Sequence, residues 1–234
     1  MKDRKTLLME LESKLSVEFK EIELLNTSLT HSSYANQKKD VQYNERLEFL
    51  GDSVLQLCIS EYLYLNYHDK TEGELTKMRA LIVCENSLYE IAKGWGIGNY
   101  IRMSKGEELT GGRTRTSILA DCVEAIIAAI YIDGGFEKAK AFILVNFIDT
   151  INKAIKNEIV LDYKTKLQEF IQQKGNSNIR YDLISFEGPP HRRKFYTEVV
   201  IDDKVNGKGV GFTKKESEQS AAKEALVTLE VIHE

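Results

Sequence analysis

Residues 44–55 read Asn44-Glu45-Arg46-Leu47-Glu48-Phe49-Leu50-Gly51-Asp52-Ser53-Val54-Leu55, an apolar run that carries three carboxylates. On an α-helix, the side chains of Glu45, Glu48 and Asp52 fall within an arc of about 60°. The apolar residues Leu47, Leu50, Val54 and Cys58 fall on the opposite side. The spacing therefore predicts a helix with one apolar stripe facing the core and one acidic stripe.

Gly51 lies inside this predicted helix, immediately before Asp52. A glycine in a helix interior costs about 1 kcal/mol relative to alanine. We therefore expect another part of the chain to pack closely against the backbone at Gly51.

A second apolar stretch, residues 117–127, carries Asp121 and Glu124 on one helix face. Isolated acidic residues on a helix are usually solvated surface groups, but burying several carboxylates without compensation is costly. Hard divalent cations such as Mg²⁺ and Ca²⁺ prefer oxygen ligands and would remove that cost. We therefore expect the two helices to pack with their acidic stripes adjoining and to bind a divalent metal.

The composition bounds the class of protein. A chain of 234 residues with 42% hydrophobic residues suits one large or two modest domains. The three cysteines, Cys58, Cys84 and Cys122, show neither disulfide nor metal-ligand spacing, which favours a reducing compartment. No apolar run reaches the length of a membrane span. We expect a soluble cytoplasmic protein.

Periodicity predicts two domains. Residues 1–152 show apolar residues at helical spacing and are expected to be all-α, and 153–160 form a short linker. Residues 161–234 predict the order αβββα, with both helices on one side of a three-stranded antiparallel sheet. Within this part, Asn206-Gly207 indicates a hairpin turn, residues 207–213 a third strand, and Lys214 the start of the last helix.

The motifs resemble those of ribonuclease III, the double-stranded-RNA endonuclease, followed by a double-stranded-RNA-binding domain. The resemblance rests on residues 44–55, on Leu29-Thr30-His31-Ser32-Ser33-Tyr34-Ala35-Asn36, on Glu72-Gly73-Glu74 and on residues 117–124. It implies an enzyme that hydrolyses phosphodiester bonds in duplex RNA with Mg²⁺-activated water, Mn²⁺ being a possible substitute. The products would be 5′-phosphate and 3′-hydroxyl ends with short 3′ overhangs. Ribosomal RNA and other structured precursors are the substrates that the family leads us to expect.

By the same resemblance, Glu48, Asp52, Asp121 and Glu124 would bind the metal, with Asp52 and Glu124 the most critical. Glu45 and Glu72 match supporting acidic positions, and Glu72 could act across a dimer. Phe49 lies beside the acidic stripe, away from the predicted core face, so it would be exposed in a monomer. The family is homodimeric, and the aromatic residue at this position inserts into the other subunit. We interpret His31 as a hydrogen-bonded residue at a helix end or in the core.

Several segments are candidates for contact with RNA. The loop at 111–116 places Arg113 and Arg115 before the second acidic helix, where it is either an ordinary connector or a phosphate contact. The resemblance assigns RNA binding in the second domain to three segments. They are a helix face with Gln168 and Gln172, a loop with His191 and Arg192, and a helix N-terminus with Lys214 and Lys215. Ser217 stands where alanine is usual in the family, and Glu218 where many relatives have a base.

Net charge neither supports nor excludes this reading. The total is −4, of which residues 161–234 contribute zero, with 12 basic and 12 acidic residues. RNA binding would therefore depend on local patches rather than on an overall positive field.

One alternative function is that of a double-stranded-RNA-binding protein that does not cleave, although such a protein would be expected to lose some of the six acidic positions. Another is a hydrolase of small phosphate esters, which leaves the second domain unexplained.

Overall fold

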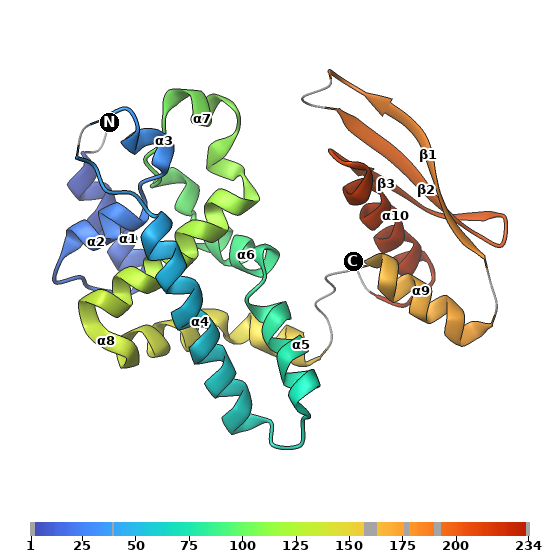
Figure 1. The fold of residues 1–234 in the computed structure, drawn as a ribbon, viewed down its shortest axis with the longest axis horizontal. Helices are drawn as coiled ribbons and strands as arrows, with labels where there is room; N and C mark the ends of the chain where they lie inside the picture. Colours follow the sequence, from blue (N-terminus) through green and yellow to red (C-terminus); the bar gives the residue numbers. More distant parts are fainter. Residues whose placement is uncertain (1–2, 39, 157–162, 176–177, 190–192, 233–234) are drawn as a thin grey trace. The chain divides into compact units, whose positions relative to one another are not determined.

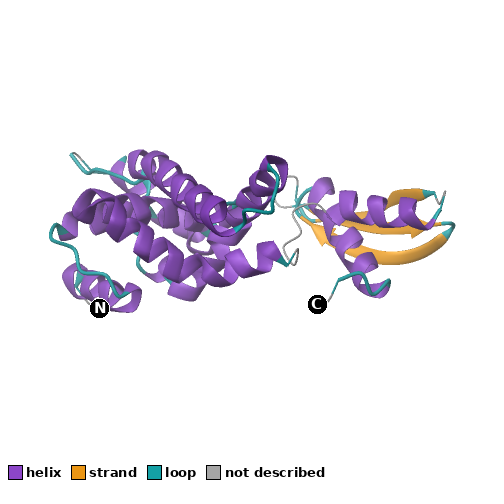
Figure 2. Ribbon diagram, turned by 90° about the horizontal axis from the view of Figure 1, so that it is seen from below, coloured by secondary structure: helices purple, strands orange, loops and turns teal. Residues whose placement is uncertain are grey.

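The structure is a computed structural model that describes residues 3–38, 40–156, 163–175, 178–189 and 193–232. The chain divides into two compact units, Met1–Lys156 and Asn157–Glu234 (Figure 1). Figure 2 shows helices in the first unit and both helices and strands in the second. Among the described residues, no helix is both long and apolar enough to cross a membrane.

The first unit is all-α, as predicted. Its elements are α1 (Arg4–Leu15), α2 (Ile22–Ser28), α3 (Ser32–Ala35), α4 (Glu45–Asn66), α5 (Glu72–Ile82), α6 (Glu85–Trp95), η1 (Ile97–Asn99), α7 (Lys105–Leu109), η2 (Gly112–Thr114) and α8 (Thr116–Ile155). Local signals explain several of the helix ends. Thr71 and Glu74 form a reciprocal capping box at the start of α5, and Gly96 ends α6 with a left-handed φ of 66°.

Helix α8 is interrupted once and is longer than the sequence led us to expect. Gly135 has φ 81° and ψ 177°, which are not helical values, so the helix kinks there. It then continues through Ile155, so it includes residues 153–155, which the sequence assigned to the linker. The following residues, 157–162, lie outside the described part of the chain.

The packing of α4 against α8 positions the acidic residues. Leu47, Val54 and Cys58 are buried on α4, as the apolar stripe predicted, and Leu50 is half-buried. A Cβ atom built on Gly51 would lie 1.8 Å from the backbone carbonyl oxygen of Glu124. The expectation of a close contact at Gly51 is therefore confirmed, and the contact is with the second acidic helix.

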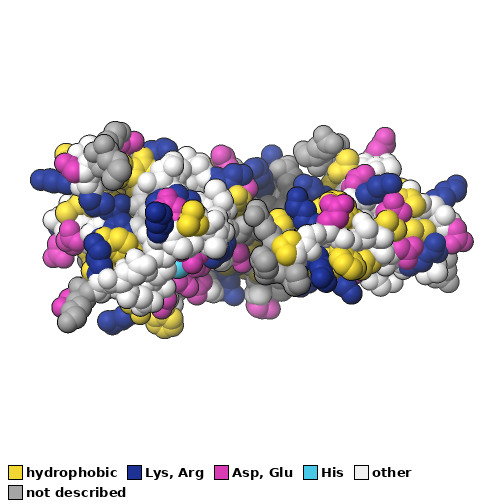
Figure 3. All heavy atoms as spheres, turned by 90° about the horizontal axis from the view of Figure 1, so that it is seen from above, with side chains coloured by type: hydrophobic (Ala, Val, Ile, Leu, Met, Phe, Trp, Pro, Cys, Tyr) yellow, Lys and Arg dark blue, Asp and Glu magenta, His cyan; other side chains and the backbone are white. Residues whose placement is uncertain are grey.

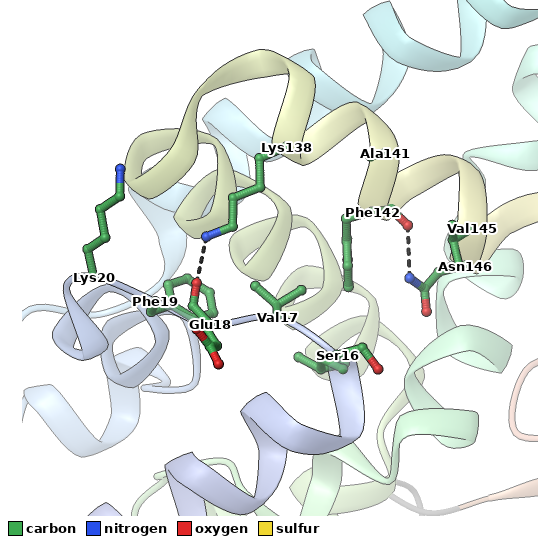
Figure 4. Close-up of a pocket in the computed structure, with 11 residues that line it drawn as sticks. Ser16, Val17, Glu18, Phe19, Lys20, Lys138, Ala141, Phe142, Val145 and Asn146 are labelled. Atoms are coloured by element: carbon green, nitrogen blue, oxygen red, sulfur yellow. Dashed lines mark hydrogen bonds between the residues drawn. The ribbon is translucent and has the colours of Figure 1, made fainter.

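A pocket of about 710 Å³ lies elsewhere in this unit, between the loop after α1 and the second half of α8 (Figure 4). Val17, Phe19 and Phe142 contribute apolar walls. The Lys138 Nζ atom donates a hydrogen bond to the Glu18 carbonyl oxygen at 2.5 Å and pairs with Asp133, which ties the loop to α8. None of the predicted site residues lines this pocket.

The second unit has the predicted order αβββα. Its elements are α9 (Tyr163–Lys174), β1 (Ile179–Glu187), β2 (Lys194–Ile201), β3 (Lys204–Gly211) and α10 (Lys214–Thr228). The strands form one antiparallel sheet in the order β1-β2-β3. Its core consists of apolar residues from both helices and the sheet, chiefly Leu167, Ile171, Val199, Ile201, Ala221, Ala225 and Leu226.

The hairpin turn predicted at Asn206-Gly207 was wrong. The turn is at Asp202-Asp203, whose φ values of 46° and 63° give the left-handed conformation that aspartate tolerates. Gly207 lies within β3 and pairs with Val199, so the third strand runs over Lys204–Gly211 rather than 207–213. A Cβ atom on Gly207 would lie 2.4 Å from the Ala221 carbonyl oxygen, so this glycine serves close packing with α10.

Candidate active site and RNA-binding surfaces

Helix α4 presents the first half of the acidic residues. Glu45 is exposed, whereas Glu48 and Asp52 are half-buried. Both carboxylate oxygens of Asp52 accept hydrogen bonds from the Gln56 Nε2 atom, at 2.8 and 2.9 Å. Gln56 is one helical turn after Asp52 and restrains its carboxylate, a role that the sequence analysis missed although the spacing of four residues could have indicated it.

Helix α8 presents the second half, in its first two turns. Asp121 and Glu124 are both half-buried, and the contact at Gly51 brings the backbone of Glu124 against α4. The Asn44 Nδ2 atom lies 3.8 Å from the Cys122 sulfur and donates to it, which links the residue before α4 to the residue after Asp121. As predicted, α4 and α8 pack with the residues of their acidic stripes next to each other.

The electrostatics show that the carboxylates act on one another. Burial and, to a lesser extent, the charges of Asp52, Glu48 and Asp121 together raise the pKa of Glu124 to about 8. Burial raises the pKa of Asp121 to about 6, with contributions from the charges of Glu48, Glu85 and Glu45. The pKa of Glu48 is also raised, by burial and by the charges of Glu45 and Asp52. We call Glu48, Asp52, Asp121 and Glu124 the acidic site.

The donor set of the acidic site suits a hard divalent cation. In the described part of the chain, no lysine or arginine forms a salt bridge with any of the four carboxylates. Nor do any three acidic, histidine or cysteine side chains in these ranges converge into a ready-made metal cage. Without a cation, the negatively charged carboxylates repel one another. A divalent cation bound among them attracts each carboxylate and outweighs this repulsion. The carboxylates are close enough to raise one another's pKa, so they fit a cation that draws them together.

Two further acidic residues, Glu72 and Glu85, differ in how they relate to the acidic site. Glu72 is exposed at the start of α5 and accepts a hydrogen bond from the Thr76 hydroxyl at 2.9 Å. It is not among the described charges that raise the pKa of Glu48, Asp121 or Glu124. Glu85, the first residue of α6, is among those acting on Asp121, and the sequence analysis missed it. Its contribution depends on how α6 packs, which no local spacing reveals.

His31 has the helix-end role that the sequence analysis favoured. It precedes α3, and its Nδ1 atom accepts a hydrogen bond from the Ser33 backbone N–H at 3.2 Å.

Phe49 is 79% exposed, so the aromatic residue beside the acidic stripe does lie on the surface of the single chain.

The two arginines of the loop before α8 are already paired. The Arg113 Nε atom is 2.5 Å from the Glu108 carboxylate, and its Nη1 atom donates to the carbonyl oxygens of Gly98 and Ile101. Arg115 is ion-paired with Glu107. These contacts hold the loop together, so each guanidinium would have to exchange a carboxylate for a phosphate in order to bind RNA.

In the second unit, Gln168 and Gln172 share one face of α9 and line a shallow pocket with Lys164, Ile179 and Tyr181. Lys214 and Lys215 are exposed at the start of α10, where Thr213 caps the helix. The predicted contacts His191 and Arg192 lie outside the described residues. The positions of both lysines place positive charge at a helix N-terminus, which favours anions.

The two residues that depart from the family pattern have structural partners. The Ser217 hydroxyl lies 2.7 Å from the hydroxyl of buried Thr197 and donates to the Lys214 carbonyl oxygen at 2.9 Å. Glu218 forms a salt bridge with Lys164 of α9 at 2.5 Å. Ser217 therefore satisfies a buried hydroxyl, and Glu218 links the two helices of this unit.

Comparisons with known proteins cover nearly the whole chain. The family described as Ribonuclease-III-like matches residues 21–151, and the family described as Double-stranded RNA binding motif matches residues 163–229. Ribonuclease 3 of Clostridium kluyveri is 69% identical over 220 residues, which are 94% of this chain and 90% of that protein. Ribonuclease 3 of Clostridium tetani is 65% identical over 224 residues, which are 96% of this chain and 95% of that protein.

Solved structures give the same result for the first unit. The nuclease domain of ribonuclease III from Campylobacter jejuni matches with a TM-score of 0.57 and 45% sequence identity. The match covers 60% of this chain and 96% of that one, and the structure is described as flexible in a region involved in dimer formation.

Proposed function

Because the chain belongs to the ribonuclease III family, we propose that its acidic site binds Mg²⁺ and hydrolyses phosphodiester bonds there. The chain is an endoribonuclease that acts on double-stranded RNA. The observation that carries the metal assignment is the pKa of Glu124, raised to about 8 by burial and by Asp52, Glu48 and Asp121. At neutral pH the Glu124 carboxyl group would hold a proton unless a cation beside it favoured the carboxylate form.

The residues of the acidic site have separable roles. Asp52 follows Gly51, which packs against the Glu124 backbone, and its charge raises the pKa of Glu124, so these two carboxylates are suited to hold a cation together. Glu48 and Asp121 supply further oxygen ligands, and Glu45 adds negative charge at the rim. When bound, Mg²⁺ (or Mn²⁺) lowers the pKa of water and neutralises charge that develops on the phosphate. The Gln56 side chain fixes the orientation of the Asp52 carboxylate before substrate arrives.

We further propose that the protein works as a homodimer joined through α4. Large apolar side chains are exposed along that helix, namely Phe49, Leu57, Tyr64 and Leu65. Beside Phe49, a pocket of about 490 Å³ is lined by apolar residues that include Leu24, Leu47, Leu50 and Ile132. An aromatic ring of a second copy would fill such a pocket and remove both apolar surfaces from water. A two-fold arrangement would supply two acidic sites for the two strands of one duplex, giving staggered ends, and could bring Glu72 to the partner's site.

We propose that the second unit holds the duplex by shape. A domain of this kind spans about 16 bp through minor-groove and phosphate contacts. Gln168 and Gln172 are placed to meet the groove, and Lys214 and Lys215 to meet phosphates, while the loop with His191 and Arg192 would supply a further groove contact. Recognition by shape suits structured precursors such as those of ribosomal RNA.

The decisive experiment is cleavage of an end-labelled RNA duplex of about 30 bp, long enough for two such domains. Reactions contain Mg²⁺, Ca²⁺ or chelator, and a parallel set uses Glu124→Gln with Mg²⁺. We expect staggered double-strand cuts by the unmodified protein with Mg²⁺ alone, and duplex binding without cutting by Glu124→Gln. Binding without cleavage under every condition would instead identify a non-cleaving RNA-binding protein, and full activity of Glu124→Gln would exclude the assigned metal site.

A further inference from the structure

The nuclease unit carries a group of three cations whose described contacts include no salt bridge. Lys38 and Arg102 lie over the ring of Tyr34, and Arg4 shares a hydrogen-bond acceptor with Arg102; we call these four residues the Tyr34 patch. In the described part of the chain, none of the three cations forms a salt bridge, in contrast with Arg113 and Arg115. Figure 3 views the unit from the side where Figure 1 draws α3 and α7, and it shows several groups of Lys and Arg side chains there.

Tyr34 is held between two of these cations. The Arg102 guanidinium carbon is 4.2 Å from the centre of the Tyr34 ring, and the Lys38 Nζ atom is 4.8 Å from it. The interactions of Lys38 and Arg102 with the Tyr34 side chain lower the pKa of its phenol. The ring thus holds two positive groups close together, at a position where Lys38 is exposed.

Arg4 extends the patch below the surface. Its Nε atom donates to the Asn26 Oδ1 atom at 2.8 Å, and the Arg102 Nη1 atom donates to the same oxygen at 3.2 Å. The Arg4 Nη2 atom is buried without a hydrogen-bond partner. Burial and the charge of Arg102 lower the pKa of Arg4 to about 10, and Glu23 is the carboxylate that opposes this shift. Glu23 therefore acts on Arg4 and itself accepts a hydrogen bond from the Asn26 amide.

The backbone links this patch to the acidic site. Arg102 exchanges hydrogen bonds with Leu29 and His31, and on the other side of that segment the Asn44 N–H donates to the Thr30 carbonyl oxygen. Arg102 and Asn44 therefore both hydrogen-bond to the short backbone segment from Leu29 to His31. Asn44 directly precedes α4 and donates to Cys122, next to Asp121.

We propose that the Tyr34 patch binds phosphate groups of the duplex RNA whose scissile bond lies at the acidic site, a proposal that rests on the proposed function. Phosphates follow one another about every 3.4 Å along each strand of a duplex, so one within a few nucleotides of the scissile bond can reach the patch. A phosphate supplies the negative charge that the three cations lack. Lys38 makes the most exposed contact, and Arg102, oriented by Tyr34 and Asn26, makes a directional one.

The test measures duplex binding by the full chain in Ca²⁺ as a function of salt. Losing one phosphate contact reduces the slope of log affinity against log salt by about 0.9. For Lys38→Gln, the loss of affinity between about 50 and about 200 mM salt should therefore be about 3-fold smaller than for the unmodified protein. Arg102→Gln should behave similarly, and Arg102→Lys should recover part of the slope.

Lys93→Gln is the matched control. Lys93 also lies over a tyrosine, 5.2 Å from the centre of the Tyr89 ring, but it is paired with Glu90. Its replacement should leave the slope unchanged. Equal slopes for Lys38→Gln and the unmodified protein would overturn the proposal, even if Arg102→Gln failed to fold. Cleavage in Mg²⁺ is measured separately. If the proposed function is wrong, the unmodified protein does not cleave the duplex. If only the phosphate-binding role of the Tyr34 patch is wrong, the unmodified protein still cleaves the duplex.

Discussion

Glu124 carries the most strongly perturbed charge of the acidic site. Its pKa is raised from 4.5 to about 8, chiefly by burial. When the pKa of a carboxyl group is higher in the folded state than in the unfolded state, the group stabilises the folded state fully at pH values below its unfolded pKa. This stabilisation is lost as the pH rises through the folded pKa. In the absence of metal, Glu124 should therefore make the nuclease unit less stable as the pH rises from about 4.5 to about 8.

Glu124→Gln should remove this pH dependence, because the amide keeps the size of the side chain without its charge. Each pKa unit corresponds to about 1.4 kcal/mol, and solvent screening at this partly exposed site reduces the total to about 1–2 kcal/mol. We expect the chelator-treated variant to melt about 3–6 °C higher than the unmodified protein at pH 8, with little difference at pH 4.5. Glu72→Gln, at an exposed position, is the control. Thermal unfolding with equal pH dependence in all three proteins would contradict the assignment.

Gly51 sets the distance between α4 and α8. A methyl group there would lie 1.8 Å from the Glu124 carbonyl oxygen, so the helices would have to separate where the acidic residues meet. Gly51→Ala should destabilise the protein by about 3 kcal/mol and abolish most of the cleavage. Gly94→Ala is the control, because nothing lies within 4 Å of its added methyl group and alanine favours the helix by about 1 kcal/mol. Denaturant unfolding and duplex cleavage measure both effects, and a fully active Gly51→Ala protein would refute the argument.

At the scale of elements, periodic patterns and the pairing of the two acidic helices could be predicted from the sequence, whereas most individual contacts between side chains could not. The apolar and acidic stripes of residues 44–55 and 117–127 led to α4, to the start of α8 and to their adjoining faces. Gly51 indicated that another segment packs closely against it, but not that this segment is α8 at Glu124. The effect of Glu85 on Asp121 and the contact of Arg102 with Tyr34 join residues far apart in the sequence. The ion pairs of Arg113 and Arg115 are with residues only 5 and 8 positions away, but they depend on how the loop folds back. No local pattern records such contacts.

Strand β3 shows why the hairpin was misplaced. Its alternate glycines, Gly207, Gly209 and Gly211, all face α10 at distances that exclude a Cβ atom. The Asn206-Gly207 pair resembles a turn signal, but Gly207 is required for helix packing. The turn itself uses two aspartates in the left-handed conformation, which is a weaker signal in sequence.

Gly209→Ala tests this packing. The added methyl group would lie 2.0 Å from the Ser217 carbonyl oxygen, so α10 would have to move away from the sheet. We expect a loss of about 2–3 kcal/mol in the stability of the second unit and weaker duplex binding, because Lys214 and Lys215 begin that helix. Val210→Ala, at an exposed neighbouring position, should change neither property. Urea unfolding and a binding titration make the comparison, and equal behaviour of the two variants would rule out the packing role.

At the scale of the whole molecule, one acidic site can cut one strand, whereas cleavage of a duplex requires two. The proposed dimer meets this requirement, and it explains why α4 exposes apolar residues next to its carboxylates. Phe49, 79% exposed, would be the residue of this surface that enters the partner. A carboxylate in its place would be buried without a counter-charge, which costs several kcal/mol per subunit.

Phe49→Asp should therefore dissociate the dimer while leaving each nuclease unit folded, because Phe49 is not part of the core of the single chain. Sedimentation should give the mass of one chain for the variant and of two for the unmodified protein. Duplex cleavage should fall by at least about 100-fold, because binding energy of several kcal/mol is lost between subunits. Val145→Asp is the matched control, since Val145 is 74% exposed on α8 and lies outside the proposed interface. A dimeric Phe49→Asp protein would show that the chain associates through another surface.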